Sequence, residues 1–458
     1  MIILGTNSIK DTGYDVANSC RFFNNTQLKR TNGSPTNAYK GTFSAWVKRS
    51  ALSSTRLFQN MVDGNNYAWL AFNSSHQLEV VCAVSGSTYC DYKTNRLFRD
   101  VSAWYHIVVE MDTTEGTATN RMKFYVNGVQ ETSFATQTFN GGQNSNHPLL
   151  IASTTNYHTI GASEANTLNL DGYMTEVVLL DGQALDPTSF GEFDEDSGIW
   201  KPIDVSDLTF GNNGYYLDFE DSSALGNDAA GSNNFTVNNL TAIDQSTDTC
   251  TNNFATLNPL DKPGTGNLPG FAEGNLHYNK TATGSGNNSQ ANSTIAVNTG
   301  KWFFEIKALD SNAIIVGIDN ADNPTYDSHG NSINSSDGGI AYYNNGQKIV
   351  YGTASSYGAS WTTNDIIGIA INLDDNEITF YKNGSSQGAI SITTTGINYR
   401  PAIMNNGYNS TSSAYMNFGN PPFSISSGNS DGNGYGNFEY SVPSGYYALN
   451  TKNLAEYG

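Results

Sequence analysis

The chain has 458 residues, of which 14% are charged, and 42 acidic residues against 22 basic ones give it a formal net charge of −20. This balance argues against binding to nucleic acid or to an anionic membrane surface, because both require clustered Lys and Arg. Asn, Ser, Thr and Gly supply the polarity instead, which is typical of a loop-rich β-protein whose surface suits neutral polar ligands such as sugars.

The first residues, MIILGTNSIKDTG, contain an apolar run of three residues, whereas the core of a secretory signal needs about seven to fifteen. No stretch approaches the roughly 18 apolar residues of a membrane span. We therefore expect a protein that is made in a cytoplasm, has no cleaved signal and does not insert into a membrane.

Apolar and polar residues alternate in the first half of the chain, beginning with TFSAWV at 42–47. This period of two is the mark of a half-buried β-strand. Further strands are predicted at 57–58, 67–72, 78–84, 104–111, 122–126, 149–151, 159–161 and 171–180. Asp186-Pro187 is a good N-cap and first-turn pair, so a short helix is predicted over 187–193. Little other helix is expected.

Two hairpins repeat one pattern. Residues 104–128 and 361–384 each begin at a Trp, alternate, turn, alternate again and end in Phe-Tyr-X-Asn-Gly. The repeat predicts that Phe124 and Phe380 point inward at equivalent positions. It also predicts the fold class: an all-β protein with two jelly-roll-type antiparallel β-sandwiches in tandem, joined by a polar connector.

The boundaries follow from composition. Residues 1–205 form the predicted first sandwich, and residues 206–270, rich in Asn, Ser and Thr, form a connector whose scattered aromatic residues pack it on a domain surface. The Pro and Gly cluster at 258–270 is the predicted boundary. Residues 271–458 form the second sandwich, in which Trp302 and Trp361 are assigned to the core. Its strands are predicted at 302–306, 313–318, 338–343, 348–351, 366–382, 400–404 and 415–418.

Segments of both halves resemble known domain families. FSAWVK, WYHIVVEMD, MKFYVNG, TIGAS and DGYMTEVVLLDGQALDP resemble, in order, the strands of concanavalin A-like, laminin G-type jelly rolls over about residues 35–200. GKWFFEIKA, GGIAYYNNGQK, WTTNDIIGIAINLDDNEITFYKNG, RPAI and MNFGNPPF stand in the order of a SPRY (B30.2-like) domain over about residues 271–425.

The tandem as a whole, with a connector that ends TNNFATLNP and a tail that ends GYYALNTKNL, resembles virion proteins of marine and cyanobacterial phages. The resemblance implies a non-enzymatic structural protein in a tail fibre or capsid-attached appendage, located on the virion surface after assembly in the host cytoplasm. It implies other virion proteins as partners and contact of the sandwich loops with a host-surface glycan or protein. Because shallow tyrosine-bearing loops offer only weak single-site contacts, we also expect a homo-oligomer or repeated attachment to a symmetric virion scaffold. A purely architectural virion component is an alternative.

A second alternative is a glycan hydrolase of concanavalin-like fold, in which paired carboxylates on a strand carry the reaction. The run EFDED at 192–196 imitates that spacing but follows Pro187 outside any apolar strand, so no catalytic residue is assigned.

The histidines, at 76, 106, 147, 158, 277 and 329, are scattered and predict no zinc site. Cys82 and Cys90 flank AVSGSTY and could face each other across a hairpin; the sequence leaves open whether they form a disulfide or stay thiols.

No organic cofactor is expected. The laminin G resemblance allows calcium at a loop edge, for which Asp171 and Asp181 are the candidate ligands, with solvated turn residues as the alternative interpretation. For ligand binding we select loop tyrosines that can stack on a sugar or enter a partner's pocket, the alternative being that they pack on their own domain. These tyrosines are Tyr326, Tyr351, Tyr357 and Tyr408.

Overall fold

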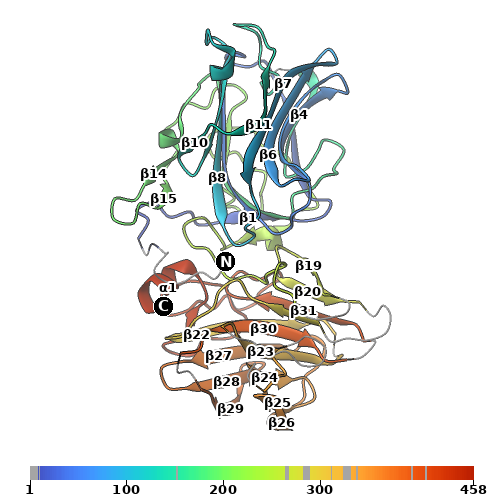
Figure 1. Ribbon diagram of the computed structural model, residues 1–458, viewed down its shortest axis with the longest axis vertical. Helices are drawn as coiled ribbons and strands as arrows, with labels where there is room; N and C mark the ends of the chain where they lie inside the picture. The colour runs from blue at the N-terminus through green and yellow to red at the C-terminus, as the bar shows by residue number, and fades with distance from the viewer. Residues whose placement is uncertain are drawn as a thin grey trace. The chain divides into compact units, whose positions relative to one another are not determined.

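The computed structural model describes residues 9, 11–150, 153–263, 268–281, 289–310, 312–322, 332–336, 339–393, 396–407 and 410–458, the backbone alone at 153–156. The chain divides into two compact units, one formed by Thr12–Thr251 and one built on Asn252–Gly458. Each unit consists of two large, almost entirely antiparallel β-sheets (Figure 1). The predicted all-β fold with two sandwiches in tandem is confirmed.

The first unit pairs two sheets of eight strands each within the described residues. One sheet has the order β10 (Val129–Glu131), β9 (Met122–Val126), β8 (Trp104–Asp112), β3 (Lys40–Arg49), β13 (Gly172–Asp181), β1 (Ser19–Phe22) and β18 (Gln245–Ser246), with β16 (Tyr215–Leu217) also on β13. The other has the order β11 (Phe134–Phe139), β7 (Ser87–Leu97), β6 (Gln77–Val84), β5 (Asn66–Phe72), β4 (Thr55–Asp63), β12 (Ser153–Ile160), β2 (Gln27–Asn32) and β17 (Thr236–Asn238).

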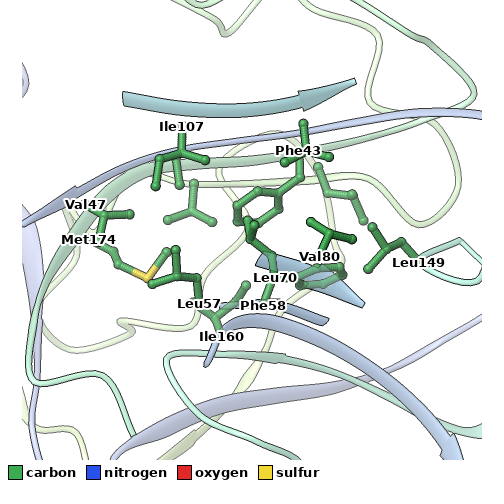
Figure 2. Packing of buried hydrophobic residues seen from close by; sticks show 14 of the residues in the cluster. Phe43, Val47, Leu57, Phe58, Leu70, Val80, Ile107, Leu149, Ile160 and Met174 are labelled. Atoms are coloured by element: carbon green, nitrogen blue, oxygen red, sulfur yellow. The ribbon is translucent and has the colours of Figure 1, made fainter. Parts of the chain in front are cut away.

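The core of the first unit lies between its two sheets, where alternate residues of each strand meet (Figure 2). Phe43 of β3 stacks on Phe58 of β4, with ring centroids 5.2 Å apart and an interplanar angle of 21°. Ile107, Met174, Leu70, Val80 and Ile160 surround this pair. The apolar alternation seen in the sequence is therefore the inner face of a sandwich.

The second unit is a sandwich of the same kind. One sheet has the order β19 (Gly270–Ala272), β20 (His277–Lys280), β31 (Ser412–Asn417), β22 (Lys301–Ala308), β27 (Ile366–Asn372), β28 (Glu377–Lys382) and β29 (Ser385–Ser391), with β32 (Tyr447–Ala448) parallel to β22. The other has the order β21 (Ser289–Asn292), β30 (Tyr399–Asn405), β23 (Ile314–Asn320), β24 (Gly339–Tyr343), β25 (Gln347–Val350) and β26 (Thr353–Ser356). Trp302 and Trp361 lie in the core between them, as predicted.

The repeated hairpin is confirmed in its details. Phe124 lies opposite Val109 and Phe380 lies opposite Ile369, and both Phe rings are fully buried in the cores of their units. The Asn-Gly pair that follows each hairpin has positive φ at both residues, as a type I′ turn requires. In each copy the Asn side chain accepts a hydrogen bond from a backbone N–H on the preceding strand, at 2.8 Å in both cases.

The helix predicted after Asp186 differs from the structure. The predicted helix over 187–193 is a single 3₁₀ turn, Pro187–Ser189, because the residues after it form β14 (Gly191–Phe193), which pairs with β15 (Trp200–Pro202). The start of the turn is as predicted, since the Asp186 side chain accepts a hydrogen bond from the Thr188 N–H. Further short 3₁₀ turns occur at Ala118–Asn120 and Ala242–Asp244.

The connector is divided between the units. Residues 206–251 supply β16, β17 and β18, each of which extends a sheet of the first unit. Residues 252–258 belong to the second unit, so the structure places the division before the predicted boundary at 258–270. The second unit ends in one helix, α1 (Thr451–Tyr457). No helix in the described residues is long and apolar enough to cross a membrane.

Candidate ligand-binding cleft

The connector motif TNNFATLNP and the tail motif GYYALNTKNL pair with each other in the second unit. Asn253 and Thr451, 198 positions apart, exchange two 3.0 Å hydrogen bonds: the Asn253 N–H donates to Thr451 Oγ1, and the Thr451 N–H donates to the Asn253 carbonyl. Phe254 bridges Asn450, and the Ala255 N–H donates to the Leu449 carbonyl at 2.9 Å. The two motifs therefore fix the end of the chain to the sandwich.

This attachment decides where α1 begins. The Asn450 side chain accepts a hydrogen bond from the Asn453 N–H at 2.9 Å and so acts as the N-cap. Asn453 in turn donates from its side chain to Asp431 at 2.7 Å, and Leu454 is buried. The helix is short, but these contacts hold it against the sheet.

An open cleft of about 290 Å³ lies beside this tail. It is formed where the start of β22, the β27–β28 turn, the segment around β32 and the end of α1 come together. Its lining residues are Thr299, Gly300, Lys301, Asp374, Gly445, Tyr447 and Tyr457.

Two tyrosines provide the aromatic wall of the cleft. The rings of Tyr447 on β32 and Tyr457 on α1 stack with centroids 3.9 Å apart and an interplanar angle of 11°. Hydrogen bonding with Tyr457 raises the pKa of Tyr447 to about 12, so its hydroxyl keeps its proton at neutral pH. A stacked pair of this kind presents a flat ring face with polar hydroxyls at its edge.

Polar groups also line the cleft. Asp374 accepts a hydrogen bond from the Gly300 N–H at 2.8 Å, which ties the β27–β28 turn to the start of β22. Lys301 donates to Asp375 at 2.8 Å, and Asp375, whose side chain is 65% exposed, also accepts from Asn372. The Lys301–Asp375 ion pair and the Asp374 carboxylate together leave one more acidic than basic group beside the cleft. The cleft therefore offers ring faces and hydrogen-bonding groups, which suit a neutral polyhydroxy ligand.

Sequence reasoning did not select Tyr447 and Tyr457. Both lie in the tail beyond the period-two strands, and the tail is brought to the sandwich by its pairing with residues 252–255 and by the pairing of β32 with β22. The signal that could have found them was the recurrence of tyrosine in the tail, at 446, 447 and 457.

The predicted tyrosines lie elsewhere. The hydroxyl of Tyr351 accepts a hydrogen bond from the Thr393 N–H at 2.7 Å and lies 3.3 Å from the Tyr399 hydroxyl. Tyr357 packs its ring against Phe380, with centroids 6.0 Å apart, and donates its hydroxyl to the Gly388 carbonyl. The contacts of both tyrosines are thus within their own unit, outside the cleft. Tyr326 and Tyr408 lie outside the described residues.

The two candidate calcium ligands are not brought together. Asp171 precedes β13 and Asp181 ends it, so a strand of about 30 Å separates them at roughly 3.3 Å per residue. Asp181 is buried and accepts hydrogen bonds from the N–H groups of Thr36 at 2.8 Å and Asn213 at 3.0 Å. The Asp171 carbonyl accepts from the Ser50 N–H at 2.8 Å.

The acidic run at 192–196 lies on the β14–β15 hairpin. Lys201 contacts both Glu192 and Asp194, at 3.4 Å and 3.3 Å, and the Glu192 side chain is 58% exposed. Hydrogen bonds from Ser197 hold the pKa of Asp194 low, at about 2. Asp194 is therefore ionised at neutral pH, and the exposed Glu192 side chain does not lie in an enclosed groove that would suit a general acid.

Comparison with known domains gives two matches. Residues 23–189 match the family model described as the concanavalin A-like lectin/glucanases superfamily, and residues 301–421 match the SPRY domain model. The matches stand in tandem, a concanavalin A-like domain followed by a SPRY domain. Both domain types were predicted from the sequence. No curated protein matches the chain.

Three solved structures are similar to parts of the chain. The SPRY domain of human HERC1 is 16% identical over 35% of this chain and 96% of that chain, with a TM-score of 0.30. The heptameric SAP-like pentraxin of Limulus polyphemus is 16% identical over 38% of this chain and 79% of that chain (TM-score 0.28). A Bacteroides ovatus protein with a provisional carbohydrate-binding assignment is 17% identical over 50% of this chain and 60% of that chain (TM-score 0.35).

Proposed function

We propose that this chain is a non-catalytic binding protein that holds a neutral glycan in the cleft of its SPRY-like unit. The observation that carries the proposal is the Tyr447–Tyr457 stack, which lines the cleft together with hydrogen-bonding groups. Sugar rings have apolar C–H faces and polar edges, and they match a site with the same two features. The placement of Glu192 and Asp194 beside Lys201 favours binding over glycan hydrolysis.

We place this binding activity on the outside of a phage particle, in a tail fibre or capsid-attached appendage. The support is the resemblance of the tandem, and in particular of the motifs TNNFATLNP and GYYALNTKNL, to phage virion proteins. The tail motif, which pairs with the connector motif, supplies two of the lining residues of the cleft, Gly445 and Tyr447. Other virion proteins and a host-surface glycan are the partners that this role requires.

Binding of a sugar at one such cleft is weak, so many copies of the protein must bind together. An open site with one aromatic stack gives affinities of about millimolar to micromolar for a sugar, or about −4 to −8 kcal/mol. Several copies tethered to one particle can raise the avidity by about 10² to 10⁴. We therefore propose a homo-oligomer, or repeated attachment to a symmetric scaffold.

The test of the binding site uses the full chain and immobilised polysaccharide from the host surface. Tyr447→Ala should abolish retention, whereas Tyr447→Phe, which keeps the ring face, should retain most of it. Tyr415→Ala is the matched control, because Tyr415 also stacks, on Phe423 at 5.9 Å, but lies outside the cleft. Equal loss in Tyr447→Ala and Tyr415→Ala would contradict the proposed site.

The particle role has its own tests. Mass spectrometry of purified virions should detect the protein, and antibody labelling should place it on the head or the tail. Release of reducing ends from the polysaccharide, abolished by Glu192→Gln, would instead show a hydrolase. Presence in virions without any glycan or host binding would favour the architectural alternative.

A further inference from the structure

Two cysteines and a histidine that are far apart in the sequence meet inside the concanavalin A-like unit. Cys82 on β6 is the antiparallel partner of Cys90 on β7, and both are free thiols. His147, in the loop after β11, brings a ring nitrogen to them, so that the three donor atoms lie within 4.8 Å of one another. All three side chains are fully buried.

The histidine is held in place by its surroundings. The backbone N–H of His147 donates to the Ala38 carbonyl at 2.8 Å, and the His147 ring meets the Tyr89 ring edge-on at a centroid distance of 5.7 Å. Nδ1 accepts a long, 3.3 Å hydrogen bond from the Leu149 N–H. Nε2 has no hydrogen-bond partner in the part of the chain that the structure describes. A buried polar atom without a partner costs free energy, which a bound ligand would recover.

We propose that Cys82, Cys90 and His147 bind a zinc ion. Three atoms that lie no more than 4.8 Å apart share a point within about 2.8 Å of each. Shortening these distances by roughly 0.5 Å for sulfur and roughly 0.7 Å for nitrogen gives the usual zinc–sulfur and zinc–nitrogen bond lengths of about 2.3 Å and 2.0–2.1 Å. Two thiolates and a neutral imidazole are ligands that zinc prefers. The fourth coordination position of the zinc ion is left to water or another small ligand.

The net charge of the ion with its ligands favours Zn²⁺ over Cu⁺ at this site. Zn²⁺ with two thiolates is neutral, whereas Cu⁺ with the same ligands leaves a net negative charge at a buried site, which is costly. Each thiol releases its proton to solvent as its sulfur binds the metal. The Nε2 proton moves to Nδ1, and the long contact with the Leu149 N–H is given up.

The test is a titration of the reduced, metal-free full chain with Co²⁺, followed by displacement with Zn²⁺. We expect a thiolate-to-cobalt charge-transfer absorption that saturates at one equivalent per chain and disappears when zinc is added. Cys82→Ala, Cys90→Ala and His147→Gln should each remove or strongly weaken it. Cys250→Ala is the matched control, since Cys250 lies in the same unit outside the cluster, and it should leave the absorption unchanged.

A second measurement needs no variant and covers the case in which a substitution prevents folding. In native mass spectrometry, the zinc-loaded chain should differ from the metal-free chain by one zinc minus two protons, because both thiols ionise on binding. No charge-transfer absorption with the folded wild-type chain would overturn the proposal. So would an absorption that survives in folded Cys82→Ala and Cys90→Ala, or a Cys82–Cys90 disulfide that persists under reducing conditions.

Discussion

Phe254 and Asn450 form an isolated antiparallel bridge that closes the SPRY-like unit at both ends of its sequence. The Phe254 ring is buried in a cluster with Phe303, Phe438 and Ala448, on the outer face of the sheet that contains β22. The residues before the first strands of the unit and the residues after its last large strand are therefore one structural feature.

The first prediction concerns the extent of this unit. A fragment of residues 252–458 should unfold cooperatively, whereas a fragment of residues 271–458 lacks the buried Phe254, Ala255 and Leu257 and should be less stable. Phe254→Ala in the full chain should cost about 3–5 kcal/mol, the usual range for a buried aromatic residue. Urea denaturation measures both effects. Equal stability of the two fragments would place the domain boundary at 258–270, as the sequence suggests.

The second prediction tests the register of the repeated hairpin. Phe380 is fully buried, with the Tyr342 ring 5.5 Å away, so Phe380→Ala should destabilise the SPRY-like unit by about 3–5 kcal/mol. Tyr381 points to the other face of the sheet and is half-buried, so Tyr381→Ala should cost clearly less. Thermal denaturation followed by circular dichroism compares them. Equal losses of stability in the two variants would contradict the assignment of Phe380 to the inner face and Tyr381 to the outer face of the sheet.

The third prediction concerns the Asn383-Gly384 turn. Asn383→Ala removes a side chain that accepts the Ile366 N–H and tolerates positive φ, which should cost about 1–2 kcal/mol. Gly384→Ala should cost more, because its Cβ would lie 2.8 Å from the Tyr440 ring. Gly434→Ala is the control: Gly434 also has positive φ, but no atom lies near its Cβ. Similar free energies of unfolding for the two glycine variants would exclude the ring contact as a cause.

The fourth prediction concerns pH and Glu176, which lies at a bulge in β13 with a φ of 50°. Burial raises the pKa of Glu176 from 4.5 to about 8, although the Tyr216 hydroxyl donates to its carboxylate at 2.8 Å. The folded state therefore binds a proton that the unfolded state loses above pH 4.5.

From this difference, the stability of the concanavalin A-like unit should fall as the pH rises from about 4.5 to about 8, by at most about 1.4 kcal/mol per pH unit. Glu176→Gln, which is always neutral, should remove this slope. Chemical denaturation of both proteins at several pH values gives the comparison. A slope that is the same in the wild type and in Glu176→Gln would contradict the protonated state of Glu176.

The sequence by itself determined that the chain folds as two β-sandwiches. Strand alternation has a period of two residues, so the inward positions of Phe124 and Phe380 and the turns at their Asn-Gly pairs follow from neighbouring residues alone. The same local signal placed Trp302 and Trp361 in the core. The prediction of a helix over 187–193 was wrong beyond the first turn, because pairing of β14 with β15 overrides the local preference for helix.

The candidate sites were decided only by the tertiary structure. Tyr447 and Tyr457 reach the cleft because the tail pairs with residues nearly two hundred positions earlier, and no local period records such a contact. Cys82 and Cys90 are close in sequence, but His147 joins them only when the loop after β11 folds over the sheet. Hydrophobic alternation records which face of a strand is buried, whereas a site depends on which loops meet, and that is fixed by the packing of the whole unit.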